Sequence, residues 1–248
     1  MEGERRRAAT GLLDAVADFR AATDKADLWS RLDRHLAPFG IGGSIYGAQA
    51  IACHDTTLNH IANSIRTDWL DNKFAQDLFY CDDFVRHARV AHQPTLWADA
   101  SRLPHLTPEA LRSLEMDYDY GVVTGVTIPM RFADGLGVSA LGCHAPDLSF
   151  AAFEAVWHRC RTRISRVARA FDLCLRCRLK EEMFTLSLRE KECLLHVAAG
   201  HRAARIAARM GLTEKQVRAV AGHACRKLNA TTLCQAVTVA LVFDLILP

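Results

Sequence analysis

Four cations lie on one face of a helix that the sequence predicts near the C-terminus. In the segment MGLTEKQVRAVAGHACRKLNATT, residues 210–232, a glycine turn precedes a basic amphipathic stretch that carries Lys215, Arg218, Arg226 and Lys227. Side chains in the first turns of such a helix can reach base edges in the major groove of DNA, and cations toward its end can hold phosphates. The expected partner is therefore DNA. The alternative is a solvated basic face on an ordinary helical bundle, because charged runs are usually surface.

The positive charge of the chain is concentrated around this helix. The whole chain has a net charge of only +3, from 31 Lys and Arg against 28 Asp and Glu. Residues 185–248 hold nine Lys and Arg against four Asp and Glu, which leaves 22 against 24 for the preceding 184 residues. A local excess of cations is typical of a module that meets a polyanion.

A cysteine and histidine pattern has the spacing of a zinc site. Cys174-x-x-Cys177 is followed by Cys193-x-x-His196. All four residues fall in apolar helical stretches, however, where cysteine behaves as a small hydrophobe. The nine cysteines are irregularly spaced in a chain too long to need disulfides. The sequence therefore predicts reduced thiols, no metal and no cofactor.

Several polar groups could supply acid–base chemistry. They are His54–Asp55, His87, His92 and Cys143–His144. None of them falls in a nucleophile or metal motif of known spacing. An enzyme is thus the competing hypothesis from another functional class, and the sequence predicts a protein that is not an enzyme.

Four helices are expected to position the basic segment. Ser187 to Glu190 forms a capping box that begins LREKECLLHVAAG, and RAARIAARM makes a short second helix. Thr213-x-x-Gln216 is a second capping box, which opens a third helix to about Leu228, and TTLCQAVTVALVFDLI supplies a fourth. The last 62 residues are therefore predicted to form a four-helix domain with a helix-turn-helix, whose third helix is the recognition helix.

The remainder of the chain alternates helical and strand patterns. Helices are expected in AATGLLDAVADFRAA, in KADLWSRLDRHLAPF and over residues 68–90, and a strand in SIYGAQAIA. Thr107 caps a helix to about Tyr118, VVTGVTIPMRF and GLGVSALGCH form a hairpin around ADG, and a long helix follows from Phe150 to Lys180. The expected fold class is α+β, with an N-terminal α/β/α sandwich that can enclose a small molecule.

The sequence also bears on the location of the protein. No apolar run approaches the roughly 18 residues of a membrane span. The N-terminal MEGERRRAAT leads into an amphipathic stretch rather than a signal-peptide apolar region. We expect a cytoplasmic protein without a membrane partner.

The C-terminal segment LSLREKECLLHVAAGHRAARIAARMGLTEKQVRAVAGHACRKLNATTLCQAV closely resembles the DNA-binding domain of LuxR-type transcription factors. The resemblance includes Leu-Ser-x-Arg-Glu at its start, the Gly-Leu-Thr-Glu-Lys turn and the closing Arg-Lys-Leu. The DNA-binding residues are expected to be Thr213, Lys215, Gln216, Arg218, Arg226 and Lys227. AVAG at residues 219–222 stands where relatives often carry polar residues that read bases, so operator specificity is expected to be unusual or weak.

The stretch DWLDNKFAQDLFYCDDFVRHARVAHQPTLW resembles the ligand-binding region of acyl-homoserine-lactone receptors, the quorum-sensing branch of that family. Trp69, Asp82 thirteen residues later, Trp97 and Gly125 match the motif of that branch in identity and spacing. The resemblance implies an acyl-homoserine lactone as the ligand and a homodimer as the assembly. It also implies an autoinducer-binding domain over residues 1–178, a linker over 179–184 and a DNA-binding domain over 185–248.

The chemistry of this set is coherent with such a ligand. A buried carboxylate must find a donor, and a ligand amide N–H would satisfy Asp82. The indole N–H of Trp69 suits a lactone carbonyl, and Trp97 offers an aromatic wall. Taken singly, each tryptophan is more often a core residue than a ligand contact, and the set at matching spacing is what favours the site. The expected ligand-binding residues are Trp69, Lys73, Asp82, Trp97, Gly125 and Tyr46.

Two positions depart from the family pattern. Lys73 stands where the family usually has a tyrosine that donates to the acyl carbonyl, and Asp83 replaces the usual proline. The lysine could donate in place of tyrosine, pair with Asp83 or extend to solvent. The alternative function is a regulator without lactone response, which acts constitutively or as an inhibitory dimer partner. A phosphorylation-driven response regulator is disfavoured, because the N-terminus opens with helices and lacks a strand that ends in paired aspartates.

Overall fold

The structure is a computed structural model, and it describes residues 14–50, 59–97, 107–178 and 180–247. The chain divides into two compact units. One comprises Met1–Gly47, Ile61–Met130 and Ser139–Leu175, and the other Ala48–His60, Arg131–Val138 and Arg176–Pro248. The second unit thus joins the C-terminal helices to the ends of sheet strands. The pair His54–Asp55 lies outside the described residues.

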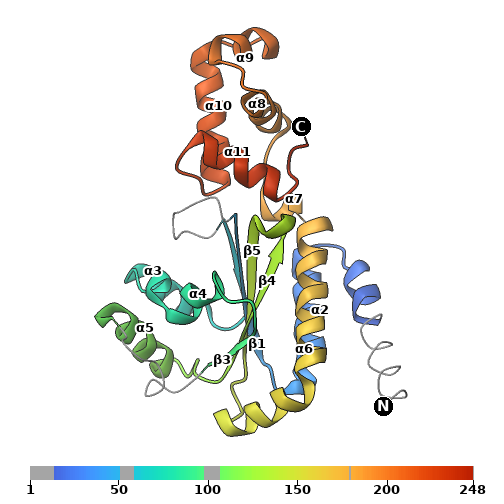
Figure 1. Cartoon of the computed structure of the whole chain (residues 1–248), viewed down its shortest axis with the longest axis vertical. Helices are drawn as coiled ribbons and strands as arrows, with labels where there is room; N and C mark the ends of the chain where they lie inside the picture. Colours follow the sequence, from blue (N-terminus) through green and yellow to red (C-terminus); the bar gives the residue numbers. More distant parts are fainter. Residues whose placement is uncertain (1–13, 51–58, 98–106, 179, 248) are drawn as a thin grey trace. The chain divides into compact units, whose positions relative to one another are not determined.

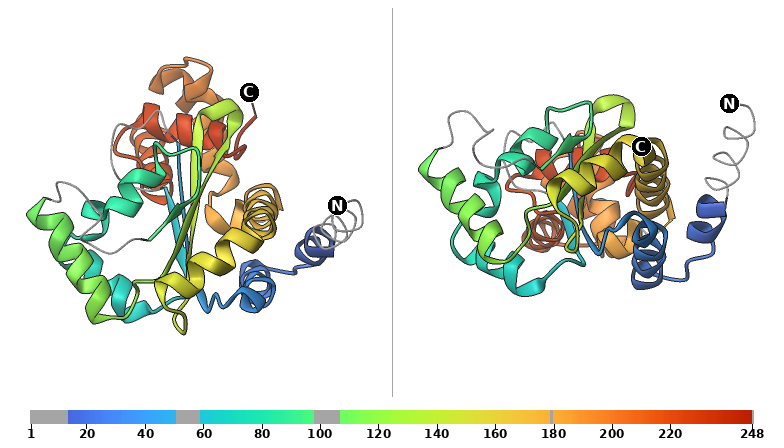
Figure 2. Two further views of the ribbon diagram at one scale, coloured as in Figure 1. Left: turned by 60° about the horizontal axis from the view of Figure 1, so that its bottom comes forward. Right: turned by 90° about the horizontal axis from the view of Figure 1, so that it is seen from below.

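A five-stranded sheet runs through the N-terminal part in the order β2-β1-β5-β4-β3. Its strands are β1 (Gly43–Ala50), β2 (His60–Asn63), β3 (Thr95–Leu96), β4 (Gly125–Phe132) and β5 (Gly137–His144). Figure 1 shows α2 and α6 on one side of the sheet and α3, α4 and α5 on the other, and the views of Figure 2 agree. The predicted α/β/α sandwich is confirmed, and the short strand β2 is an element that the sequence reading missed.

The helices α2 (Lys25–Leu36) and α6 (Phe150–Arg178) form one layer. Asp24 caps α2 by accepting from the backbone N–H of Asp27, and Leu28, Leu32 and Leu36, which are spaced by one helical turn, are buried. Phe171 of α6 meets the rings of Phe19, Trp29 and Tyr46 edge-on. Such edge-to-face aromatic contacts add to the apolar area buried between the helix layer and the sheet.

The other layer differs from the sequence prediction at one point. The helical structure expected over residues 68–90 is present, but it is divided into α3 (Thr67–Ala75), η2 (Phe79–Cys81) and α4 (Asp83–Ala88). Asp77 has a left-handed backbone, with φ +56°, and the side chain of Asp82 caps α4. The left-handed residue leaves the helical backbone conformation, and the Asp82 carboxylate takes the place of backbone carbonyls as the acceptor for the first N–H groups of α4. The helix α5 (Pro108–Asp119) then follows, capped by Thr107 as expected.

The C-terminal helices are α7 (Lys180–Met183), α8 (Leu188–Ala198), α9 (Ala203–Met210), α10 (Glu214–Lys227) and α11 (Leu233–Val242). Both predicted capping boxes are present, at Ser187 with Glu190 and at Thr213 with Gln216. Gly211 turns the chain between α9 and α10 with φ +64°, a conformation that glycine adopts without strain. The four-helix domain with its helix-turn-helix is confirmed.

The cysteines of the zinc-like pattern occupy helical positions. Cys174 and Cys193 are buried and Cys177 is exposed, and the thiol of Cys174 donates to the carbonyl of Phe19. Within the described ranges, no group of three His, Cys, Asp or Glu side chains is arranged to hold a metal ion. None of the helices described is long and apolar enough to cross a membrane.

Candidate functional site

Two buried side chains of α3 point toward the helices α4 and α5. Trp69 and Lys73 are one helical turn apart and are the buried residues of α3, and the side chain of Lys73 is 0% exposed. A lysine is almost never buried to this degree unless its charge is paired. The partners of Lys73 therefore decide what this site can do.

Lys73 lies between two carboxylates. Its Nζ is 2.5 Å from Oδ2 of Asp82 and 2.7 and 2.9 Å from the two carboxylate oxygens of Asp117. It also lies 5.2 Å from the centre of the Trp69 ring, in cation–π range. Two of the alternatives for Lys73 are thereby wrong: it does not reach solvent, and Asp83 pairs instead with Arg86 at 3.8 Å.

Asp82 caps a helix as well as pairing with Lys73. Its Oδ1 accepts the backbone N–H groups of Phe84 and Val85, at 2.8 and 3.3 Å, so it is the N-cap of α4. Its Oδ2 accepts from Lys73. Since a carboxylate has about four acceptor positions, one position on Asp82 remains open.

Asp117 is the residue that links Trp69 to this network. The Trp69 Nε1 donates to Oδ1 of Asp117 at 2.8 Å. Burial, and next the charge of Asp82, raise the pKa of Asp117 to about 7, although Lys73 and the indole N–H act in the opposite direction. Burial alone would lower the pKa of Lys73, but the two carboxylates outweigh it and raise that pKa. Lys73 is thus charged at neutral pH, and Asp117 gains or loses its proton there.

Trp97 is held on the sheet by the pairing of β3 with β4. Its backbone N–H donates to the carbonyl of Gly125 at 2.9 Å, and its Nε1 donates to the hydroxyl of Thr127 at 2.8 Å. A Cβ placed at Gly125 would lie 2.7 Å from the Trp97 ring and 2.2 Å from the carbonyl oxygen of Cys143. Gly125 is therefore needed for the close approach of the indole to the strand.

The two tryptophans belong to one apolar cluster. Trp69, Trp97 and Val122 are its buried members, with Ile45 and Phe84 among the residues packed against it. This cluster lies on the side of the sheet that α3, α4 and α5 cover (Figure 1). The structure therefore brings Trp69, Lys73, Asp82, Trp97 and Gly125 to one region.

Tyr46 lies elsewhere. Its hydroxyl donates to Asp172 of α6 at 2.8 Å, and its ring meets Phe171. Successive residues of a strand point to opposite faces of a sheet, and the neighbour Ile45 packs with the tryptophans. The structure thus separates Tyr46 from the other expected ligand-binding residues.

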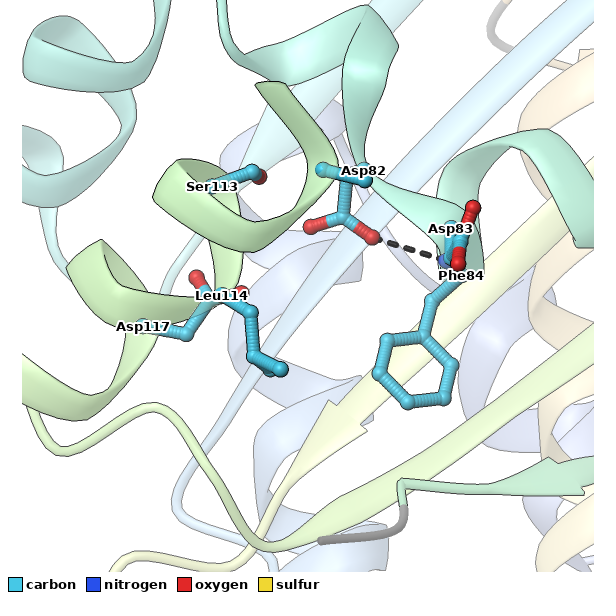
Figure 3. A pocket seen from close by; sticks show the side chains of 7 residues that line it. Asp82, Asp83, Phe84, Ser113, Leu114 and Asp117 are labelled. Carbon is cyan, nitrogen blue, oxygen red and sulfur yellow. Dashed lines mark hydrogen bonds between the residues drawn. The ribbon is translucent and has the colours of Figure 1, made fainter. Parts of the chain in front are cut away.

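A small pocket opens beside Asp82, between the start of α4 and α5 (Figure 3). Its interior has room for about one water molecule. The residues that line it are Asp82, Asp83, Phe84, Ala110, Ser113, Leu114 and Asp117. In Figure 3 the side chains of Asp82, Ser113 and Asp117 point toward one another.

The sequence reading missed Ser113 and Asp117. Both occupy the buried face of α5, with Ala110, Leu114 and Met116. A signal was present in the sequence, because a serine and an aspartate at helical spacing fall on an otherwise apolar face. Buried polar residues of this kind are more informative than exposed ones.

Two of the groups considered for acid–base chemistry, Cys143 and His144, are buried. Burial raises the pKa of the Cys143 thiol to about 12. Burial also lowers the pKa of His144, whose Nε2 lies 3.0 Å from the carbonyl oxygen of Gly121. A thiol that stays protonated is a poor nucleophile.

The expected DNA-binding residues divide into two groups on α10. Lys215, Arg218 and Arg226 are exposed. Thr213 and Gln216 are also exposed, but their side chains form the cap of the helix. Arg218 lies 3.5 Å from Glu214, in a surface pair that contributes little to stability and can be exchanged for another partner.

Lys227 has a structural partner. Its Nζ is 2.8 Å from Oε2 of Glu190, a side chain that is only 6% exposed and belongs to the capping box of α8. Burial acts against ionisation of Glu190, but Lys227 and the N–H of Ser187 lower its pKa. Replacing Lys227 would therefore change the stability of the domain as well as any phosphate contact.

Gly222 lies within α10 without a steric requirement for glycine. A Cβ at this position would meet only the end of the Arg226 side chain, at 3.9 Å. Glycine inside a helix costs about 1 kcal/mol relative to alanine. Nothing in the structure explains why position 222 is a glycine.

Comparisons with known proteins cover most of the chain. A family model described as the autoinducer binding domain matches residues 24–175. A model described as bacterial regulatory proteins, luxR family, matches residues 184–240. The HTH-type quorum sensing-dependent transcriptional regulator RpaR of Rhodopseudomonas palustris is 29% identical over 189 residues, which are 75% of this chain and 74% of RpaR.

Solved structures have the same fold. SdiA in complex with octanoyl-rac-glycerol aligns with a TM-score of 0.57 and 16% identity, over 94% of this chain and 93% of that one. SdiA of Escherichia coli in another structure aligns with a TM-score of 0.57 and 17% identity, over 96% and 98%. The N-acylhomoserine lactone dependent LuxR family factor CepR2 of Burkholderia cenocepacia has a TM-score of 0.56 and 14% identity, over 68% and 96%.

Proposed function

Because this chain belongs to the LuxR family of quorum-sensing transcription regulators, with an autoinducer-binding domain and a DNA-binding helix-turn-helix, we propose that its N-terminal domain binds an acyl-homoserine lactone. Ligand binding then controls the attachment of α10 to an operator. The family consists of regulators and not of enzymes. We further propose that the protein acts in the cytoplasm as a homodimer.

One observation carries the lactone proposal. Trp69 and Trp97 lie in the same apolar cluster, and Asp82 is joined to Trp69 through Lys73 and Asp117. Residues that stand far apart in the sequence thus meet beside one apolar surface, as a ligand with a polar head and an acyl chain requires.

Each group has a role in this scheme. The open acceptor position of Asp82 takes the amide N–H of the ligand, and Trp97 forms a wall beside the head group. The indole N–H of Trp69 leaves Asp117 and donates to the lactone carbonyl. The acyl chain lies among apolar side chains such as Ile45 and Phe84. The neighbour SdiA holds octanoyl-rac-glycerol, which also joins an acyl chain to a small polar head.

A second candidate function is regulation without lactone. The observation that favours it is the closed network around Lys73, in which the chain itself supplies the donors to Asp82 and the acceptor for Trp69. A site whose polar groups are already paired loses little when no ligand binds. Such a regulator would act constitutively or as an inhibitory dimer partner.

The lactone proposal is tested by thermal melting of the full chain with a panel of acyl-homoserine lactones. A lactone at about 100 times its Kd should stabilise the wild-type protein by roughly 2.7 kcal/mol. Asp82→Asn should lose most of this gain, because it removes a charge and puts an NH₂ group where an acceptor is needed. Asp172→Asn is the matched control, since Asp172 is a buried aspartate on the other face of the sheet.

The control should respond to lactone as the wild type does. If no lactone in the panel shifts the melting of the wild type, the second candidate function replaces the first. An equal loss of response in Asp82→Asn and Asp172→Asn would remove Asp82 from the site.

For DNA we propose that Arg218 reads a base edge and that Arg226 holds a phosphate. Arg218 is one turn into α10, whereas Arg226 is in its last turn. Arg218→Ala should weaken operator binding by about 1–3 kcal/mol more than binding to random DNA, and Arg226→Ala should weaken both equally. Titration of labelled duplexes at several salt concentrations measures this. Equal losses on both duplexes for Arg218→Ala would contradict the base-reading role.

A further inference from the structure

The pocket between the start of α4 and α5 contains a hydroxyl group that no other part of the described chain uses. Ser113 is 1% exposed, and no group within the described residues lies in hydrogen-bond distance of its Oγ. Its side chain points into the pocket, toward the carboxylates of Asp82 and Asp117 (Figure 3). Because a buried hydroxyl without a partner costs free energy, its presence indicates a bond to a molecule outside the chain.

The size of the pocket limits what this partner can be. Its interior has room for about one water molecule. A lactone ring is too large for such a space, whereas a single hydroxyl group is about the size of a water. The pocket adjoins the apolar cluster of Trp69 and Trp97, because Phe84 lines the pocket and also packs against that cluster. A small polar substituent on a ligand that lies against the cluster can therefore enter the pocket.

The polar groups of the pocket offer a free donor and a free acceptor. The donor is the O–H of Ser113. The acceptor is Asp117: Lys73 contacts both of its oxygens and the Trp69 indole contacts Oδ1, which leaves one position open on Oδ2. In the proposed lactone complex the open position on Asp82 is taken by the amide N–H of the ligand. The group that fits must therefore accept from Ser113 and donate to Asp117.

We propose that the ligand is an acyl-homoserine lactone with a hydroxyl group at the 3-position of its acyl chain, and that this hydroxyl occupies the pocket. It accepts from Ser113 and donates to Asp117, so both groups are paired. Only two carbon atoms separate the carbon that carries it from the amide nitrogen, so the amide reaches Asp82 and the hydroxyl reaches the pocket together. The inference rests on the proposed lactone binding and names the oxidation state of the 3-position.

Other acyl chains fit the pocket less well. A 3-oxo group has no donor, so its oxygen would accept from Ser113 but would face the carboxylate of Asp117. An unsubstituted chain either places a methylene group between the hydroxyl and the carboxylate or leaves a water there. A ligand hydroxyl that reproduces the hydrogen bonds of this water loses none of them and releases the water to solvent.

The preference for a hydroxyl over an oxo group should depend on pH. Asp117 faces Lys73 and Trp69 from α3, Asp82 from the start of α4 and Ser113 on its own helix, and its pKa is raised to about 7. A protonated Asp117 can donate to an oxo group, whereas the ionised form can only accept. The affinity for the 3-hydroxy ligand relative to the 3-oxo ligand should therefore rise roughly tenfold from about pH 6 to about pH 8.

Calorimetric titration of the full chain tests the proposal with sets of homoserine lactones that differ only at the 3-position. Each set contains the unsubstituted, 3-oxo and 3-hydroxy ligand, and the sets have hexanoyl, octanoyl or dodecanoyl chains. The two enantiomers of each 3-hydroxy ligand are titrated separately, because a donor and an acceptor in fixed places suit only one of them. In the set that binds best, we expect one 3-hydroxy enantiomer to bind roughly tenfold more tightly than the unsubstituted lactone.

Ser113→Ala should remove this preference. It should lower the affinity for the 3-hydroxy lactone roughly tenfold and leave the affinity for the unsubstituted lactone unchanged, because only the hydroxyl uses Ser113. The variant should keep the fold, since Ser113 makes no side-chain hydrogen bond within the described chain. Ser139→Ala is the matched control: Ser139 is equally buried but bonds Asp172, so this variant should keep the preference.

The outcomes separate the inference from the proposed function. Equal affinities for the ligands of a set would mean that the pocket holds an ordered water only, and this would overturn the inference alone. Tightest binding of the 3-oxo ligand near pH 8 would also overturn it, as would an equal loss of affinity for all ligands in Ser113→Ala, which is typical of a purely structural residue. If no lactone of any set binds, the proposed function fails and the inference fails with it.

Discussion

Lys73→Met is expected to lower the free energy of unfolding by about 3–5 kcal/mol near pH 8, because it leaves two buried carboxylates without their cation. Methionine has a similar length and removes the charge. The measurement is urea unfolding followed by circular dichroism. Lys191→Met is the control: Lys191 pairs with the exposed Glu181, and the loss of such a pair should cost less than about 1 kcal/mol.

The stability lost in Lys73→Met should become smaller as the pH is lowered. The pKa of Asp117 is already raised to about 7, from an ordinary value of 3.8, and removal of Lys73 raises it further. A carboxyl group with a raised pKa in the folded state contributes stability at low pH that is lost as the pH rises through that pKa. Near pH 5 Asp117 is therefore neutral, and one of the two unpaired charges disappears.

A double variant tests whether the unpaired charge of Asp117 causes the loss of stability. Asp117→Asn in the Lys73→Met background removes the same charge at all pH values, so it should recover part of the stability lost near pH 8. If Lys73→Met unfolds at the same urea concentration as the wild type, or if its loss is independent of pH, the buried network does not stabilise the fold.

Gly125→Ala is expected to destabilise the protein by about 3 kcal/mol, at the upper end of the usual cost of overpacking. The new Cβ would stand 2.2 Å from the carbonyl oxygen of Cys143, which is backbone and cannot rotate away. It would also press on the ring of Trp97 at 2.7 Å. The indole would have to leave the strand, so the bond from Trp97 Nε1 to Thr127 should be lost as well.

Gly142→Ala is the matched control on the adjacent strand. Its Cβ would meet the Cγ2 methyl group of Ile45 at 2.9 Å and the Trp97 ring at 3.3 Å, which are side-chain atoms and not backbone. The expected cost is about 1 kcal/mol. Thermal unfolding and tryptophan fluorescence of both variants measure the difference. If Gly125→Ala destabilises the protein no more than Gly142→Ala does, the strand can move to accommodate a Cβ, and glycine is not required at position 125.

Local signals predicted the C-terminal domain well. The caps at Ser187 and Thr213, the glycine turn at Gly211 and the apolar positions of α10 act over a few residues, so they can be found in the sequence. The family motif likewise indicated that Trp69, Asp82 and Trp97 belong together. The sequence did not predict the break between α3 and α4. An aspartate such as Asp82 can lie on the surface of a helix or cap its start, and only the hydrogen bonds in the structure distinguish the two.

By itself, the sequence determined most of the helices and strands, the fold class, the helix-turn-helix and the family, because these depend on periodic patterns, capping residues and motifs that can be found locally. Only the tertiary structure decided which residues pair with Lys73. Its partners are Asp82, nine residues away, and Asp117, 44 residues away on another helix. Only packing of α3 against α5 and the start of α4 places three charges within bonding distance, because burial removes the water that would otherwise solvate each of them.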